Sequence, residues 1–171
     1  MVSNCIYDIL LGPEKSTTIF KYEINYRNYF IVTQGSVHVK LVPPVDKSFL
    51  HIDNNYSSFE FTSPINPWDI QECYKNDFSN VKVLDIVLNV GQCFYIPPHW
   101  LYSFQFLNEK TSVSSLKYRT FFNNIVIIDY IALHFLQLIN TKYIITKSKK
   151  NKKKIKDTLK DIPDKQNISI V

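Results

Sequence analysis

The sequence predicts one mainly β domain, a barrel or jelly roll closed by a C-terminal helix. Short runs rich in Tyr, Phe, Val and Ile alternate with turn residues over the first three quarters of the chain, which is the pattern of closely spaced strands. From about residue 121 the apolar positions recur at spacings of three and four, which is a helical period. A length of 171 residues suits a single domain with a real core.

Six runs are candidate strands of the barrel, which we expect to occupy residues 1–120. Gly35 and Gly91 each fall between two runs, where a positive φ is often required. The pair Pro43 and Pro44 ends a strand because proline cannot continue the ladder. The candidate strands are Thr18–Tyr22, Tyr29–Thr33, Val37–Val42, Val83–Leu88, Cys93–Ile96 and Tyr102–Leu107.

The remaining segments have other patterns. Residues 46–80 contain Pro64, Pro67 and clusters of Asn, Asp and Ser, so we expect a long loop insertion with little regular structure. Residues 121–146 are expected to form a helix, and residues 147–171 a lysine-rich, disordered tail. The apolar positions that carry the helical period are Ile125, Ile128, Ala132, Phe135, Leu136 and Ile139.

Charge is divided unevenly along the chain. Residues 1–141 carry 10 Lys/Arg and 12 Asp/Glu, a net −2, whereas residues 142–171 carry 10 Lys and 3 Asp, a net +7. Between Lys147 and Lys160 there is no arginine and no aromatic residue, so stacking on bases and bidentate readout are not available, and we expect no nucleic-acid partner. The 3 Gly of the chain leave no room for a glycine-rich phosphate loop.

The cysteines and the N-terminus indicate a reducing compartment. Cys5, Cys73 and Cys93 form no CxxC pair, and no basic region followed by an apolar stretch opens the chain, so we expect no signal peptide and an intracellular, cytoplasmic location. The apolar stretch Ile125–Ile139 raises a membrane hypothesis, but Asp129 interrupts it. A helix packed on the barrel or on a second copy is the preferred interpretation, with no membrane partner.

Two segments carry a resemblance to a known family. Residues 18–44 contain Thr-Ile-Phe-Lys-Tyr-Glu and Asn-Tyr-Phe, followed by a glycine turn and a strand that ends in two prolines. Residues 90–102 read Val-Gly-Gln-Cys-Phe-Tyr-Ile-Pro-Pro-His-Trp-Leu-Tyr. They resemble the T-x-x-H-x-D strand and the G-D-x-[LF]-[YF]-I-P-x-x-W-x-H segment of the JmjC/cupin-like (Cupin_8-type) Fe(II)/2-oxoglutarate hydroxylases. The resemblance implies a cupin jelly roll, a double-stranded β-helix barrel.

That family holds iron with two histidines and one carboxylate, and this sequence departs from the pattern. If the threonine of the first motif anchors the alignment, the H-x-D positions fall on Lys21 and Glu23. If the later asparagine and glycine are the anchors, they fall on Tyr22 and Ile24. The distal histidine falls on Tyr102 in either case. The resemblance therefore implies degenerate metal-site positions at Lys21, Tyr22, Glu23 and Tyr102, with no catalytic residue, no metal and no cofactor.

Three further residues are expected to line a pocket. Asn28 matches a pocket-lining position of the family, and Tyr95 and Trp100 belong to the second motif. For Tyr22 and Tyr102 two interpretations stand. Their hydroxyls bind a small acidic or sugar-like ligand inside the barrel, or the rings fill the space that the metal left, with hydroxyls satisfied internally. The second is preferred.

The histidines leave an alternative open. A non-standard metal site built from Glu23, His38 and His99 competes with the interpretation that these are ordinary surface or core histidines, which is preferred.

Two function hypotheses follow from the resemblance. The first is a non-catalytic binding or structural protein, with a protein partner or a homodimer formed through the C-terminal helix. Similarity to degenerate cupin-like proteins of large DNA viruses adds the virion as a location. The alternative is an Fe(II)/2-oxoglutarate-dependent hydroxylase with an altered metal site, and only then are Fe(II) and 2-oxoglutarate expected cofactors. Since the first motif lies near the N-terminus, completion of the barrel by a partner chain or a dimer is a further expectation.

Overall fold

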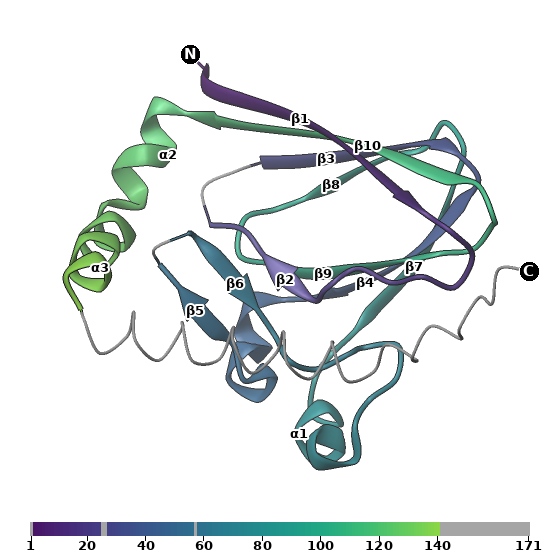
Figure 1. The fold of residues 1–171 in the computed structure, drawn as a ribbon, viewed down its shortest axis with the longest axis horizontal. Helices are drawn as coiled ribbons and strands as arrows, with labels where there is room; N and C mark the ends of the chain where they lie inside the picture. Colours follow the sequence, from purple (N-terminus) through teal and green to yellow (C-terminus); the bar gives the residue numbers. More distant parts are fainter. Residues whose placement is uncertain (1, 25–26, 57, 141–171) are drawn as a thin grey trace, which may run out of the picture.

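Two antiparallel sheets face each other in the computed structural model, which describes residues 2–24, 27–56 and 58–140 (Figure 1). Sheet A has the order β1 (Val2–Gly12), β10 (Thr111–Thr120), β3 (Arg27–Gln34), β8 (Cys93–Ile96). Sheet B has the order β5 (Asp53–Asn55), β6 (Glu60–Thr62), β2 (Lys21–Tyr22), β9 (Leu101–Phe106), β4 (Ser36–Val42), β7 (Leu84–Asn89). The expectation of a mainly β jelly roll followed by helical structure is confirmed.

Strand alternation divides the residues of β3 between the two sides of sheet A. Asn28, Phe30 and Val32 are 1% exposed and point between the sheets, whereas Ile31 points outward and is 39% exposed. Gly35 then passes the chain from sheet A to sheet B with a φ of 71°, as the sequence predicts. A Cβ at this glycine would lie 2.6 Å from Thr111 Oγ1, so the close approach requires glycine as well.

The first core fills the space between the sheets. It is apolar along most of its length, because the inward positions of both sheets carry aliphatic and phenyl side chains. Its buried members are Phe30, Val32, Val37, Val39, Leu41, Leu88, Ile96, Tyr102, Phe104, Phe106 and Val113.

A second core lies on the outer side of sheet B. Residues 43–83 fold over that side with η1 (Pro44–Leu50), η2 (Glu72–Tyr74) and α1 (Lys75–Phe78), and they add β5 and β6 to the sheet. The expectation of little regular structure in residues 46–80 is therefore wrong. The polar residues of this segment are interspersed with buried apolar residues, which the loop interpretation overlooked. The buried members are Phe20, Tyr22, Ile24, Val42, Leu50, Phe61, Ile65, Phe78, Leu101 and Ile127.

The C-terminal helix is broken. Where the sequence predicts one helix over residues 121–146, the structure has α2 (Phe121–Val126) and α3 (Ile128–Ile139). Ile127, between them, has φ −98° and ψ 14° and is 4% exposed, so burial of this side chain in the second core accompanies the turn between the helices. A capping box between Thr120 and Asn123 starts α2. Residues 141–146 and the expected tail 147–171 lie outside the described residues.

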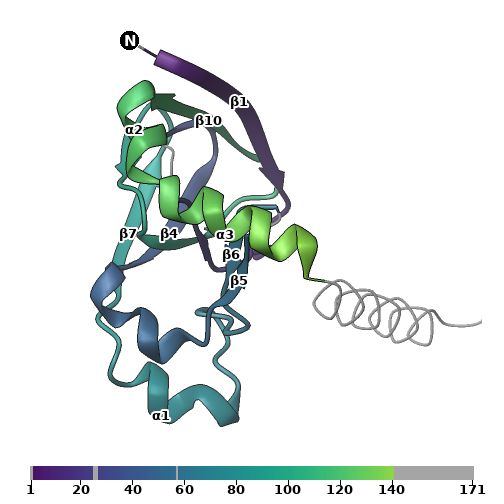
Figure 2. The same ribbon diagram turned by 90° about the vertical axis from the view of Figure 1, so that its left-hand side faces the viewer.

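The two helices lie across one end of the sheets, and α3 crosses in front of that end in Figure 2. Within the described ranges, no helix combines the length and the apolar content that crossing a membrane would need.

Four strands were missed by the sequence patterns, β1 and β10 in sheet A and β5 and β6 in sheet B. β1 and β10 pair along their whole lengths, yet neither is among the candidate strands. The candidate Thr18–Tyr22 is reduced to the two residues of β2, with a single bridge from Thr17 to Gln105 before it.

Candidate functional site

A partly buried charge cluster joins the two sheets inside the barrel. Glu23 follows β2 on sheet B, and Lys117 lies opposite it on β10 of sheet A. The Lys117 ammonium donates to Glu23 Oε1 at 2.8 Å and lies 3.6 Å from Asp8 Oδ2. The Tyr102 hydroxyl donates to the same glutamate oxygen at 3.1 Å. One carboxylate oxygen thus accepts from both a cation and a phenol.

Burial keeps the tyrosine of this cluster neutral. Tyr102 is 2% exposed, and burial first, then the nearby negative charge of Glu23, holds its pKa well above the usual value. The Lys117 and Glu23 side chains are 14% and 16% exposed. In such surroundings the ammonium and the carboxylate stabilise each other, because removing either charge alone from water would cost free energy.

The structure distinguishes the two alignments of the first motif. Lys21 is the Cα partner of Tyr102, so the two side chains share one side of sheet B, and Glu23 reaches the Tyr102 hydroxyl from that side. Tyr22 and Ile24 belong to the second core. The side chains of Lys21, Glu23 and Tyr102 therefore point into the barrel interior. Tyr22 lies on the opposite side of β2.

Tyr22 has its own aromatic surroundings in the second core. It stacks on Phe61 with ring centroids 4.9 Å apart, and the Lys47 ammonium lies 3.4 Å from its ring centroid. Burial lowers the pKa of Lys47 to about 8. The pKa of His99, 6.1 Å from Tyr22 between ring centroids, is lowered by burial and then by the Lys47 charge.

The histidine side chains do not gather around the Glu23 carboxylate, although the His99 backbone N–H donates to the Glu23 carbonyl oxygen at 2.7 Å. His38 pairs with Asp85 at 3.1 Å and lies against Trp68, whereas His99 lies beside Tyr22 in the second core. Among the described residues, no three His, Cys, Asp or Glu side chains gather as a metal site would require. The alternative site of Glu23, His38 and His99 is therefore not formed.

The three expected pocket-lining residues go to three different places. Asn28 is buried in the barrel, and no described residue bonds its Oδ1 or the Oγ of Ser115. Trp100 packs against the edge of the first core. The expectation for Tyr95 needs correction. Phe94 and Ile96 occupy the inward positions of β8, so Tyr95 points outward and is 40% exposed.

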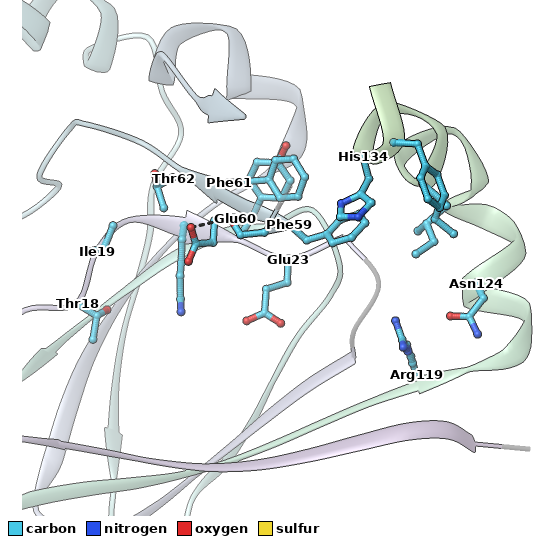
Figure 3. Close-up of a pocket in the computed structure, with 16 residues that line it drawn as sticks. Thr18, Ile19, Glu23, Phe59, Glu60, Phe61, Thr62, Arg119, Asn124 and His134 are labelled. Carbon is cyan, nitrogen blue, oxygen red and sulfur yellow. Dashed lines mark hydrogen bonds between the residues drawn. The ribbon is translucent and has the colours of Figure 1, made fainter. Parts of the chain in front are cut away.

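A pocket of about 790 Å³ opens at the end of the barrel that α3 crosses (Figure 3). Glu23 and Arg119 lie on its barrel side, and Figure 3 shows the rings of Phe59 and His134 against each other on its helix side, with centroids 5.1 Å apart. His134 is anchored by a hydrogen bond between Nδ1 and the carbonyl oxygen of Tyr56, at 2.8 Å. Other lining residues are Lys21, Glu60, Ile127, Ile131 and Phe135.

Sequence reasoning missed Lys117, Asp8, Arg119 and Glu60. The first three lie on β1 and β10 and Glu60 lies on β6, strands that are absent from the candidates. A weak signal existed, because Ser115, Lys117 and Arg119 alternate with Ser114, Leu116 and Tyr118 at the period of a strand. That period does not tell which side faces inward when the inward residues are the polar ones.

The chain is similar to several known proteins. "JmjC domain-containing protein D" of Dictyostelium discoideum is 25% identical over 103 residues, which are 60% of this chain and 23% of that protein. Among solved structures, KdgF from Halomonas sp. has a TM-score of 0.41 at 11% identity over 68% of this chain and 70% of that one. Drosophila melanogaster CENP-C bound to CAL1 has a TM-score of 0.41 at 15% identity, over 64% and 58%.

The chain spans about a quarter of the length of the curated relative that it matches, 23%. The profile of the cupin-like domain family (Cupin_8) matches residues 4–124. That range runs from β1 to α2 and takes in both sheets and the residues of the charge cluster. The chain therefore belongs to the cupin-like domain family.

Proposed function

We propose that this chain is a non-catalytic binding protein, a cupin-like barrel in which an internal ion pair stands where the family holds a metal. The observation that carries the proposal is the 2.8 Å contact between Lys117 Nζ and Glu23 Oε1. Glu23 is the carboxylate that the motif comparison leaves at the metal-site positions. A lysine ammonium already pairs with this carboxylate, so no metal cation is needed as its partner.

The donor set around Glu23 does not fit Fe(II). A facial site needs two imidazoles and a carboxylate with open positions, but the neighbours here are an ammonium, which has no lone pair, and a phenol with a raised pKa. Neither is a ligand in the form that these surroundings favour.

The pocket beside the charge cluster is the proposed ligand site. Its walls from β6 and α3 are largely apolar, and Lys21 and Arg119 contribute cations on the barrel side. Lys117 pairs with Glu23, and Glu60, which keeps its negative charge, accepts from Ser58 Oγ at 2.8 Å. This combination suits a small molecule with an apolar body and one acidic group, which concave, mostly apolar pockets with few polar groups typically bind.

Metal binding tests the first part of the proposal. The purified full chain is titrated with Fe(II) under anaerobic conditions, and its metal content is measured by mass spectrometry. We expect no stoichiometric metal, no saturable binding and no consumption of 2-oxoglutarate. One tightly bound iron per chain would favour the alternative, a hydroxylase with an altered metal site.

Substitution of the internal cation tests the same point without metal. Lys117→Met leaves Glu23 without its cation and is expected to cost about 3 kcal/mol of unfolding free energy, the low end for breaking a buried pair because the site is not completely dry. Adding Glu23→Gln should recover most of this loss. Chemical denaturation measures both, and a double variant no more stable than Lys117→Met would contradict the internal-ion-pair interpretation.

Ligand binding tests the second part. Thermal shift and calorimetry with medium-chain carboxylates should show binding that matched alkyl alcohols and amines do not show. Lys21→Met should weaken the binding, whereas Lys15→Met, outside the pocket, should not. Equal binding of the alcohols would contradict the role given to the acidic group.

A further inference from the structure

The outer face of sheet A is an uncovered apolar surface. Because Leu10, Phe30 and Val113 pack into the first core, the alternate residues of their strands point away from it. We name this surface the tyrosine face, and its residues are Tyr7, Ile9, Leu11, Tyr29, Tyr95 and Tyr118. In Figure 1 no element of the described chain lies over sheet A on this side.

The exposed fractions are large for apolar side chains. Tyr7, Ile9 and Leu11 are 77%, 68% and 73% exposed, and they form a continuous row on one side of β1. Across β10 the row continues into a group of tyrosines, where Tyr29 lies 4.9 Å from Tyr95 and 6.0 Å from Tyr118 between ring centroids. Tyrosine-rich apolar surfaces of this kind are typical of protein interfaces, and monomers rarely leave them open.

The distribution of charge on the face suits a second copy of the same chain. Arg27 is the single charged residue among the outward residues of four described segments of sheet A. These segments are residues 5–11, 27–33 and 112–118, together with β8. A two-fold interface sets each surface against itself, so a face with several like charges would repel its copy. This one has no such repulsion.

The two ends of the face are complementary to each other. Arg27 lies at one end of β3, over the Tyr118 ring at 5.9 Å. At the other end the hydroxyls of Thr33 and Ser112 lie 2.6 Å apart. A two-fold axis across the strands, near the middle of β3, brings the arginine of each copy over the hydroxyl pair of the other, where donors meet acceptors at both rims.

From these observations we infer that the tyrosine face packs against the same face of a second copy, giving a homodimer in which two sheets A lie face to face. This inference does not depend on the ligand proposed above, because the pocket opens at the end of the barrel and the tyrosine face lies on its side.

The mass of the full chain in solution tests the inference, by sedimentation velocity and light scattering over a wide range of concentration. Wild-type protein should be a dimer. Ile9→Lys and Tyr95→Lys should each raise the dimer dissociation constant by about a hundredfold or more, because a charge would be buried without a partner. Val87→Lys, at a 52% exposed aliphatic position on β7 of sheet B, is the matched control and should remain dimeric.

The three cysteines provide a second readout in unmodified protein. Cys5 and Cys93 point outward from sheet A, whereas Cys73 lies in η2, and all three are exposed. Alkylation of Cys93 should slow as the protein concentration rises, while alkylation of Cys73 should keep its rate.

Several results would overturn the inference. A wild-type chain that is monomeric at every concentration, or a Cys93 rate that does not change, would exclude this dimer. Leu136 lies on α3 and is 65% exposed. A dimer that survives Ile9→Lys but dissociates on Leu136→Lys would instead place the contact on α3.

Discussion

Leu50 and Leu11 both lie on the outer side of a sheet, yet Leu50 is completely buried and Leu11 is 73% exposed. Leu50 ends η1, within the segment that folds over sheet B, and it belongs to the second core. Leu11 lies on β1, whose outer side receives no covering element from the described chain. The two sheets therefore share one core between them, but only sheet B has a second core on its other side.

The difference shows how this chain uses its length. β9 is buried on both sides, with Tyr102 and Phe104 in the first core and Leu101 in the second. Residues 43–83 and α3 supply the cover for sheet B. The apolar outer residues of sheet A have no such cover. They are either left in contact with water or buried by another molecule.

The largest test of this comparison is the same substitution on the two outer faces. Leu50→Ala removes a fully buried side chain and is expected to cost about 3 kcal/mol of unfolding free energy, within the range of leucine-to-alanine changes in cores. Leu11→Ala is expected to stay within about 0.5 kcal/mol. Both are measured by urea denaturation at a protein concentration low enough for the monomer. Similar losses in the two variants would show that the outer face of sheet A is covered in solution.

A smaller test compares two serines. Ser103 is completely buried, donates to the Thr18 carbonyl at 2.7 Å and accepts from Trp68 Nε1 at 2.8 Å. Ser103→Ala leaves both partners unsatisfied beneath the covering segment and should cost about 1 to 3 kcal/mol. Ser114 lies on the outer side of sheet A, and Ser114→Ala should change stability by less than about 0.5 kcal/mol.

Denaturation curves of the two serine variants check this. If Ser103→Ala is also nearly neutral, the hydrogen bond from Trp68 does not hold the cover on sheet B, and the second core depends on its apolar contacts alone.

Sequence patterns found the strands whose alternation has apolar residues inside. β3, β4, β8 and β9 begin and end within two residues of their candidate runs, and the positive φ at Gly35 and Gly91 is confirmed. β10 was missed because its inward positions include Ser115 and Lys117, which an amphipathic pattern assigns to solvent.

The candidate site was only partly predictable for the same reason. Glu23 and Tyr102 could be named because they lie in motifs, and the structure joins them. Lys117 could not, because it is 94 residues from Glu23 in the sequence and meets it only across the barrel. The alignment left Tyr22 as an equal alternative, and the face of a two-residue strand is decided by its pairing partners rather than by its own pattern.

The smallest test compares two cations that lie over tyrosine rings. Lys47 lies 3.4 Å from the Tyr22 ring centroid within the second core, and burial lowers its pKa to about 8. Arg27 lies over Tyr118 on the open face of sheet A. A guanidinium keeps its proton throughout the accessible pH range, so only the lysine should link stability to pH.

The sign follows from which state holds the proton. An unfolded lysine has a pKa near 10.4, so between about pH 8 and pH 10.4 the unfolded chain binds a proton at Lys47 that the folded chain has lost, and stability rises with pH. Below pH 8 both states are charged, and the folded state bears the full cost of the buried ammonium.

Lys47→Met removes this cost. The variant should therefore be more stable than wild type at pH 7, by less than about 1 kcal/mol because the side chain is partly solvated, and the gap should close as the pH rises to 10. Thermal unfolding of Lys47→Met, Arg27→Met and wild type across this interval measures the effect. A gap for Lys47→Met that stays constant with pH would show that Lys47 is as well solvated as Arg27, and that the cover over sheet B admits water at this point.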